Sequence, residues 1–128
     1  QDCQKLTEVV IPNSIVAIGL FAFEGCVSLL NVNLPNSVIR IGGSAFQNCD
    51  SLSSITIPDS VKYIGAYAFN GCNFTSIAIP KSVECIKSRV FQFCPNLKNI
   101  FCEEFAKPSR WDDDWIYGTD ATVHWRKK

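Results

Sequence analysis

The stretch IPDSVKYIGAYAFNGC, residues 57–72, decides the fold because most of its positions recur along the chain at a fixed interval. Residues 26–48 and 49–71 share ten identities in 23 aligned positions, which chance does not produce. An internal repeat with a period of about 20 to 50 residues predicts a solenoid or a related array. The positions that recur every 22 or 23 residues are Cys3, Cys26, Cys49, Cys72 and Cys94; Pro12, Pro35, Pro58 and Pro80; Ser14, Ser37, Ser60 and Ser82; and Phe23, Phe46, Phe69 and Phe91.

Each unit predicts a short strand, a turn and a helical turn. Apolar residues alternate with period two, as in a half-buried strand, and proline ends each strand because it cannot donate to the ladder. The spacing of Ala22, Phe23 and Cys26 places them on one face of a short helical turn. The glycine column that begins at Gly19 is expected to permit a backbone turn. The alternating strand pairs are Val9-x-Ile11, Val32-x-Leu34, Ile55-x-Ile57 and Ile77-x-Ile79.

A unit of this size cannot bury its own apolar side. We therefore expect the units to stack as coils, with parallel strands about 4.8 Å apart. The phenylalanine column then becomes an internal aromatic spine. The fourth unit departs from the pattern, because one residue is missing between Cys72 and Ile77 and Phe74 takes the place of leucine.

Composition excludes several classes of protein. The chain has 128 residues, which favours one domain, and its 12 basic residues balance its 12 acidic ones. A balanced charge lacks the basic footprint of a nucleic-acid binder. Hydrophobic residues make up 47%, too many for a disordered chain. No apolar run approaches the roughly 18 residues of a membrane-spanning helix, so membrane insertion is not expected.

The repeated pattern Leu-x-x-Ile-x-Ile-Pro-x-Ser-Val-x-x-Ile-Gly-x-x-Ala-Phe-x-x-Cys resembles the BspA-like leucine-rich repeats, also called the Treponema pallidum type. The tail FCEEFAKPSRWDDDWIYGTDATVHW, residues 101–125, resembles the segment that closes such arrays in some bacterial members. The resemblance implies a right-handed leucine-rich-repeat superhelix of the α/β type, mainly parallel β with short helical turns. It divides the chain into repeats over residues 1–100 and a capping segment over residues 101–128. We also expect further repeats before residue 1.

The cysteine column leaves two readings open. Adjacent coils bring the sulfurs close enough for disulfides, but side chains stacked in parallel suit a bridge poorly. We therefore favour a ladder of buried free thiols. No pair has Cys-x-x-Cys spacing, so a metal site is not expected. Cys102 aligns with core positions, whereas Cys85 aligns with the outward residues Arg40 and Tyr63 and is the thiol most open to reaction.

Nothing in the sequence assembles a catalytic site. Four equivalent serines cannot share His124 as a base, so we interpret them as turn residues bonded to backbone. The run Asp112-Asp113-Asp114 lacks the remaining positions of a calcium loop. One of these aspartates is expected to cap a short helix and the others to face water. The sequence predicts no enzyme and no cofactor.

Two features of the second half have competing interpretations. The tryptophans Trp111, Trp115 and Trp125 could stack on sugar rings, but covering the last coil is the favoured reading. Asn73-Phe74-Thr75 fits the glycosylation sequon, which matters only on a eukaryotic secretory route.

The residues between the inward strand positions form the candidate binding face. Its residues are mostly small and polar. This composition fits a broad recognition surface of a solenoid, and it fits a plain solvated sheet face equally well. A second candidate is the cluster of Arg40, Lys62 and Tyr63. The proposed face consists of Glu8, Val10, Asn31, Asn33, Ser54, Thr56, Ser76, Ala78, Asn99 and Phe101.

These observations predict a non-enzymatic, monomeric binding module. Its cell-surface or secreted location and its role in adhesion, through an extracellular protein or glycan ligand, are implied by the resemblance alone. The alternatives are a structural spacer that presents another domain, and a carbohydrate-binding, tryptophan-rich cap.

Overall fold

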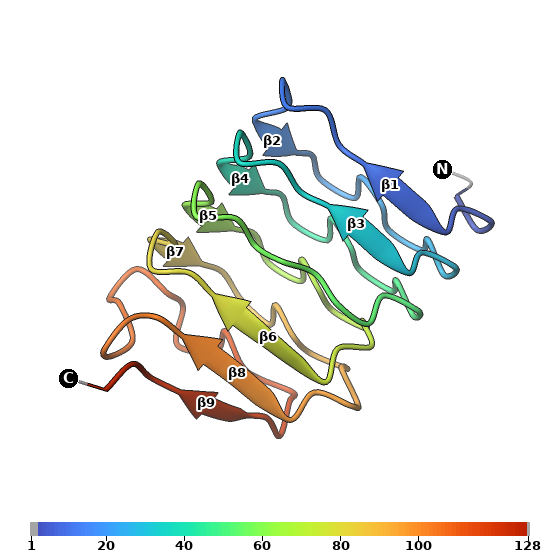
Figure 1. Ribbon diagram of the computed structural model, residues 1–128. Helices are drawn as coiled ribbons and strands as arrows, with labels where there is room; N and C mark the ends of the chain where they lie inside the picture. Colours follow the sequence, from blue (N-terminus) through green and yellow to red (C-terminus); the bar gives the residue numbers. More distant parts are fainter. Residues whose placement is uncertain (1–2, 128) are drawn as a thin grey trace.

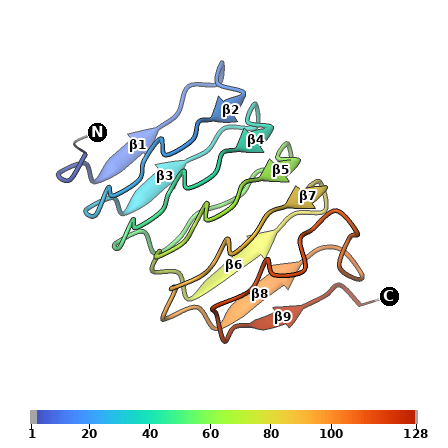
Figure 2. The ribbon, with the colours of Figure 1, turned by 180° about the vertical axis from the view of Figure 1, so that it is seen from behind.

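The computed structural model describes residues 3–127, which wind into a parallel β-solenoid (Figure 1). The short strands of successive coils fall into two rows, and Figure 2 shows the same two rows from behind. The strands are β1 (Glu8–Val10), β2 (Ala17–Ile18), β3 (Asn31–Asn33), β4 (Arg40–Ile41), β5 (Tyr63–Ile64), β6 (Ser76–Ile79), β7 (Cys85–Ile86), β8 (Asn99–Cys102) and β9 (Thr122–His124).

All the strand pairs are parallel, and their register follows the repeat. Strand β1 pairs with β3, and β6 pairs with β8, which pairs with β9. The second row runs β2-β4-β5-β7. Ile18 lies beside Ile41, and Ile41 beside Ile64, so residues one repeat apart are spatial neighbours.

The phenylalanine column forms the predicted spine. Phe23, Phe46, Phe69 and Phe91 stack with ring centroids 5.4, 5.6 and 5.9 Å apart and interplanar angles of 9° or less. The last three rings are fully buried. Offset stacking is a favoured arrangement of aromatic pairs, so each coil holds the next in register.

The short helical turns predicted from the apolar spacing are wrong. In the segment that follows each second-row strand, alternate N–H groups donate to the next coil, as Phe46 N–H does to the Ala68 carbonyl at 2.8 Å. Phe21 and Tyr67 also have positive φ, which a right-handed helix does not allow. The intervening N–H groups close tight turns, as Ala45 N–H does with the Gly42 carbonyl at 3.2 Å, so bonds between coils alternate with turns in place of a helical ladder.

The glycine column serves close packing rather than the turn. The positive φ values fall two positions later, at Phe21, Ser44 and Tyr67. A Cβ atom on Gly42 would lie 2.8 Å from the carbonyl carbon of Gly19 in the preceding coil. Glycine is required there because the two backbones approach too closely for a side chain.

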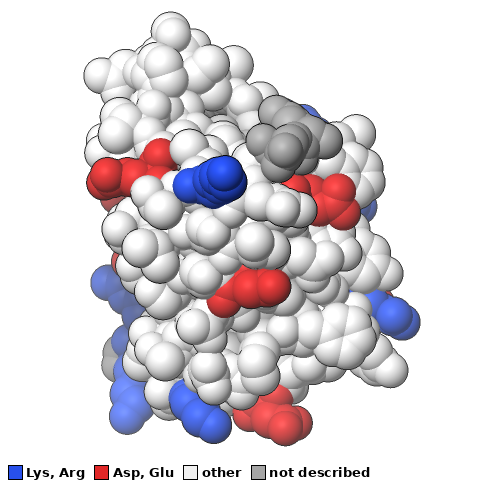
Figure 3. Space-filling view, turned by 90° about the vertical axis from the view of Figure 1, so that its right-hand side faces the viewer, with Lys and Arg blue, Asp and Glu red and all other residues white. Residues whose placement is uncertain are grey.

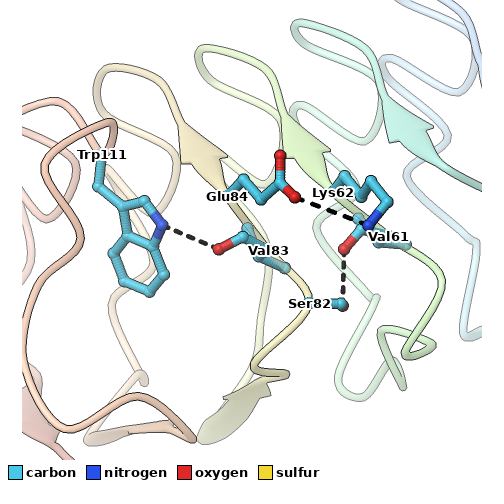
Figure 4. A network of polar contacts seen from close by, with 6 residues as sticks. All are labelled: Val61, Lys62, Ser82, Val83, Glu84 and Trp111. Atoms are coloured by element: carbon cyan, nitrogen blue, oxygen red, sulfur yellow. Dashed lines mark hydrogen bonds and ion pairs between the residues drawn. The ribbon is translucent and has the colours of Figure 1, made fainter.

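The serine column is bonded to backbone, as predicted, but across coils. Ser37 Oγ donates to the Ile15 carbonyl at 2.6 Å, and Ser60 Oγ to the Val38 carbonyl at 2.6 Å. Figure 4 shows the next member, Ser82, donating to Val61 at 2.7 Å. Each hydroxyl thus satisfies a carbonyl of the coil before it.

The tail forms one more layer over the last repeat. Strand β9 pairs with β8, and Trp111 forms a parallel bridge with Ile86 in the second row. Trp115 meets the end of the aromatic spine edge-on, 6.3 Å from the ring centroid of Phe91. The predicted boundary at residue 100 falls inside β8, and the division into repeats and cap stays a prediction.

One cysteine pair corrects the expectation of free thiols. Cys3 and Cys26 form a disulfide, whereas Cys49, Cys72 and Cys94 are free. The Cα atoms of the bridged pair are 5.0 Å apart, within the usual disulfide range. The spacing of neighbouring coils therefore permits the bridge that parallel side chains were expected to prevent.

The strand expected at Ile55-x-Ile57 is extended but unpaired. Among the described residues, no backbone hydrogen bond joins 53–57 to β3 or to β6. On the β6 side the missing residue of the fourth unit lies directly before the strand, and Asn73 N–H bonds to the Leu52 carbonyl instead. The first row is consequently split into two sheets.

Candidate binding face

The outward residues of the first row lie together on one side of the solenoid, where the sequence placed them. Register pairs Glu8 with Asn31 and Ala78 with Phe101. All ten predicted residues are exposed except Asn99, which is half-buried. Between them, Val32, Ile77 and Ile100 point into the core. Alternation with period two therefore separates the face from the core throughout the row.

A shallow groove of about 410 Å³ crosses the first three coils of this face. Of the described residues that line it, Glu8 alone is charged. The unpaired stretch 54–56 forms one wall, with Ser54 and Thr56 exposed. The groove therefore offers hydroxyl, amide and apolar groups on a rigid backbone.

Strand β9 extends the face beyond the residues predicted from the repeat. His124 stacks on Phe101 with ring centroids 4.8 Å apart, and its Nε2 lies 2.8 Å from Asn99 Oδ1. This contact explains why Asn99 is half-buried. Thr122 and His124 were missed, although the alternation of Val123 and Trp125 with polar neighbours is the strand signal that could have found them.

The second candidate cluster lies on the other row and is internally paired. The Arg40 guanidinium lies 4.3 Å from the ring centroid of Tyr63. Lys62 pairs with Glu84 at 3.7 Å, with both side chains more than half exposed (Figure 4). Exposed pairs of this kind contribute little to stability, and they leave fewer free groups for a ligand.

The free thiols differ in their surroundings. Burial raises the pKa of Cys49 to about 12 and that of Cys102 to about 12, and it also raises the pKa of Cys72 and Cys94. Cys102 is buried, as predicted. Cys85 is partly exposed, in the outward column with Arg40 and Tyr63. Reaction requires access, and among the free thiols of residues 3–127 only Cys85 is partly exposed.

The remaining polar motifs have structural partners. Asp112 accepts a hydrogen bond from Ser88, Asp113 pairs with Lys107 at 3.2 Å, and Asp114 contacts Arg89 at 3.8 Å. Residues 113–118 form turns, so the expected helix cap is wrong. Within residues 3–127, no three His, Cys, Asp or Glu side chains gather closely enough to hold a metal ion.

The tryptophans contribute to the core. Trp111 and Trp115 are 1% and 2% exposed, and Trp125 is half-buried against both. The first two rings offer no face to a sugar, so the alternative of a tryptophan-based carbohydrate site fails at these residues. At the sequon, the half-buried Asn73 accepts a hydrogen bond from Asn96 Nδ2 at 2.6 Å.

Comparison with known proteins decides the family. Residues 1–107 match the BspA type leucine rich repeat region in six copies. The chain belongs to the BspA-type leucine-rich-repeat family. A comparison with curated proteins gives no match.

Solved structures share both fold and sequence with this BspA-type chain. The chain is 39% identical to a leucine-rich repeat protein from Bacteroides ovatus over 86% of its own length, with a TM-score of 0.76. It is 30% identical to the T. pallidum leucine rich repeat protein over 92% of this chain, with a TM-score of 0.69. A leucine rich cell surface protein from Faecalibacterium prausnitzii is 25% identical over 94%, with a TM-score of 0.75.

The chain spans 27%, 51% and 32% of the lengths of these three structures, in that order. The resemblance to BspA-like repeats is thus confirmed, as is the parallel solenoid. The described part of the chain contains no helix that is long and apolar enough to cross a membrane.

Proposed function

We propose that this BspA-type module binds an extracellular protein through the first-row face, without a covalent step. The observation that carries the proposal is the row of largely exposed side chains from Glu8 in β1 to His124 in β9, which has a groove at one end and the Phe101–His124 pair at the other. Backbone and core hold this surface in place before a partner arrives. A preformed surface reduces the entropy lost on binding.

The two ends of the face offer different contacts. The groove supplies small polar groups from Asn33 and Thr56, which suit hydrogen bonding. Phe101 is 46% exposed and supplies an aromatic anchor of the kind that dominates binding energy at interfaces. The face therefore contains the anchor that its small polar strip alone lacks.

A surface or secreted location is part of the proposal. It is supported by the F. prausnitzii relative, which is described as a cell surface protein, and by the Cys3–Cys26 disulfide. Disulfides persist in oxidising compartments outside the cytosol. An adhesive role and the monomeric state belong to the same proposal.

The test is a binding screen of the chain against extracellular-matrix proteins and whole epithelial cells. A double variant, Asn33→Arg with Thr56→Arg, places two long cations in the groove, and Arg40→Gln with Lys62→Gln alters the other row as a matched control. We expect saturable binding that is lost in the first variant and kept in the second. Binding unaffected by the first variant, or no binding to any protein or cell, contradicts the proposal.

A further inference from the structure

One column of the solenoid contains a residue that its backbone does not favour. Gly25, Asn48, Gly71 and Gly118 occupy equivalent turns with φ between 60° and 87°. Glycine and asparagine are the residues that adopt this left-handed conformation most easily. The member of the column in the fourth coil is Phe93, with φ 60°. A bulky side chain in this conformation is strained, so the choice of phenylalanine does not come from the turn.

Burial does not explain Phe93 either. Its side chain is 69% exposed, whereas Phe91 two residues earlier is fully buried. Among residues 3–127, no aromatic ring packs against it. Phe21 and Tyr67 have the same positive φ in other turns, so it is the exposed ring of Phe93, which contributes nothing evident to the fold, that points to a ligand.

The ring of Phe93 stands between two hollows. One, of about 410 Å³, lies on the side of Gly71, and the other, of about 320 Å³, lies on the side of Gly118. Both neighbours in the column are glycines, and the side chains of Asn48 and Gln92 lie over Gly71 and Gly118, so the two glycine turns themselves place no side chain beside the ring. The two faces of one aromatic ring are therefore open to a ligand.

The hollow on the Gly71 side combines this ring with hydrogen-bonding groups. Its walls include Asn48, Asp50, Asn73 and Pro95. Asn48 and Asp50 are exposed and turn amide and carboxylate groups to the solvent. An amide both donates and accepts, and a carboxylate accepts from hydroxyl groups. One apolar wall beside such groups matches a sugar ring, which has an apolar C–H face bordered by hydroxyls.

The charges around Phe93 disfavour an anionic ligand. The two hollows contain the carboxylates of Asp50 and Asp120 and one ammonium group, that of Lys98. Figure 3 shows the side of the molecule where the loops that lead into the first-row strands lie, and charged side chains are few and scattered there. Among the described residues, no basic cluster lines the two hollows to hold a sulfate, a phosphate or a sialic acid.

We propose that Phe93 is the stacking platform of a carbohydrate site that takes a neutral glycan. A sugar ring lies against Phe93 in the Gly71-side hollow, with its hydroxyls bonded to Asn48 and Asp50, and the glycan extends past the ring toward the Gly118-side hollow. This site lies outside the first-row face and does not depend on the function proposed for that face.

The test uses the whole chain against an array of neutral, sialylated and sulfated glycans, followed by calorimetric titration with neutral oligosaccharides of glucose, galactose, mannose and N-acetylglucosamine. The decisive variant is Phe93→Asn, because asparagine already occupies the same turn at Asn48 and tolerates the left-handed backbone. Phe93→Tyr keeps the platform and serves as the matched control. Asp50→Asn keeps the shape of the hollow and removes its charge.

We expect binding to at least one neutral glycan, a loss of affinity of at least tenfold in Phe93→Asn, and affinity within threefold of the parent in Phe93→Tyr. The urea midpoint of Phe93→Asn should equal or exceed that of the parent. The proposal is overturned if no neutral glycan binds, if only anionic glycans bind, if Phe93→Asn binds as the parent does, or if Phe93→Asn unfolds at lower urea. Loss of a protein partner in Phe93→Asn, with no glycan bound, assigns the ring to a protein interface and also overturns it.

Discussion

The indole Nε1 of Trp111 donates a hydrogen bond to the Val83 carbonyl across 3.2 Å, in a region where both residues are buried (Figure 4). This bond ties the tail to the last repeat. The indole N–H supplies a hydrogen-bond donor to the Val83 carbonyl, as the hydroxyls of Ser60 and Ser82 do to the carbonyls of Val38 and Val61. A tryptophan therefore takes over a role that serine has in the repeats.

Replacing Trp111 by phenylalanine should destabilise the chain, because the buried carbonyl of Val83 loses its donor. The expected decrease in the free energy of unfolding is about 1–3 kcal/mol, measured by urea denaturation. Trp125→Phe is the control, since Trp125 is half-buried and its indole, within residues 3–127, makes ring contacts with Trp111 and Trp115 but no hydrogen bond. Equal effects of the two variants would show that the hydrogen bond does not matter.

The serine column allows a second comparison within one residue type. Ser60→Ala removes the bond to Val38 and should lower the free energy of unfolding by about 1 kcal/mol. Ser14→Ala should change it by less than about 0.5 kcal/mol. Ser14 is exposed and lies in the first coil that the structure describes, so no described coil precedes it to supply a carbonyl. A larger effect at Ser14 than at Ser60 would contradict the cross-coil role of the hydroxyl.

Thiol labelling should separate the cysteines by position. In the folded chain without reductant, iodoacetamide at pH 8 should modify Cys85 first, because it is the only partly exposed free thiol of the described residues. Cys49, Cys72, Cys94 and Cys102 should react only on unfolding. Peptide mapping should recover Cys3 linked to Cys26. Labelling of Cys49 as fast as Cys85, or of Cys3 without reductant, would contradict this arrangement.

The raised thiol pKa values predict a loss of stability at alkaline pH. The folded chain holds its protons on Cys49 and Cys102 up to about pH 12, whereas the unfolded chain releases them near pH 8.5 to 9. Stability from these groups is therefore complete below about pH 8.5 and decreases from there toward pH 12. The slope approaches about 1.4 kcal/mol per pH unit for each such thiol.

Urea denaturation at pH 7, 9 and 10 measures this slope. Cys49→Ala removes one of the buried thiols and should make the dependence shallower. A stability that is flat from pH 7 to 10 would show that the buried thiols ionise as easily in the folded chain as in the unfolded one.

The repeat length predicted the register of the solenoid well, for a physical reason. A fixed interval places equivalent residues in adjacent coils side by side, so Phe46 had to meet Phe69 and Arg40 had to meet Tyr63. Alternation with period two then separated core from surface. These features depend only on spacing, and spacing is visible in the sequence.

Features that depend on contacts between coils could not be predicted in this way. The apolar spacing around Phe23 is typical of a helix, but the N–H of Phe23 bonds to the Ala45 carbonyl in the next coil. The Cys3–Cys26 bridge depends on the distance between two coils. The tail departs from the repeat, so the repeat interval could not predict its strand or the contact of His124 with Phe101.

The central claim is that the first-row face is the protein-binding surface, and single-residue changes on separate sides of the solenoid test it most directly. For the partner found by screening, we would measure the dissociation constants of Thr56→Arg on the first-row face, Lys62→Glu on the second row and Phe93→Asn on the turn side. If the first-row face binds the partner, we expect at least a tenfold loss of affinity for Thr56→Arg and less than a threefold change for the other two variants. Unchanged affinity in Thr56→Arg, together with a loss in either of the others, would contradict it.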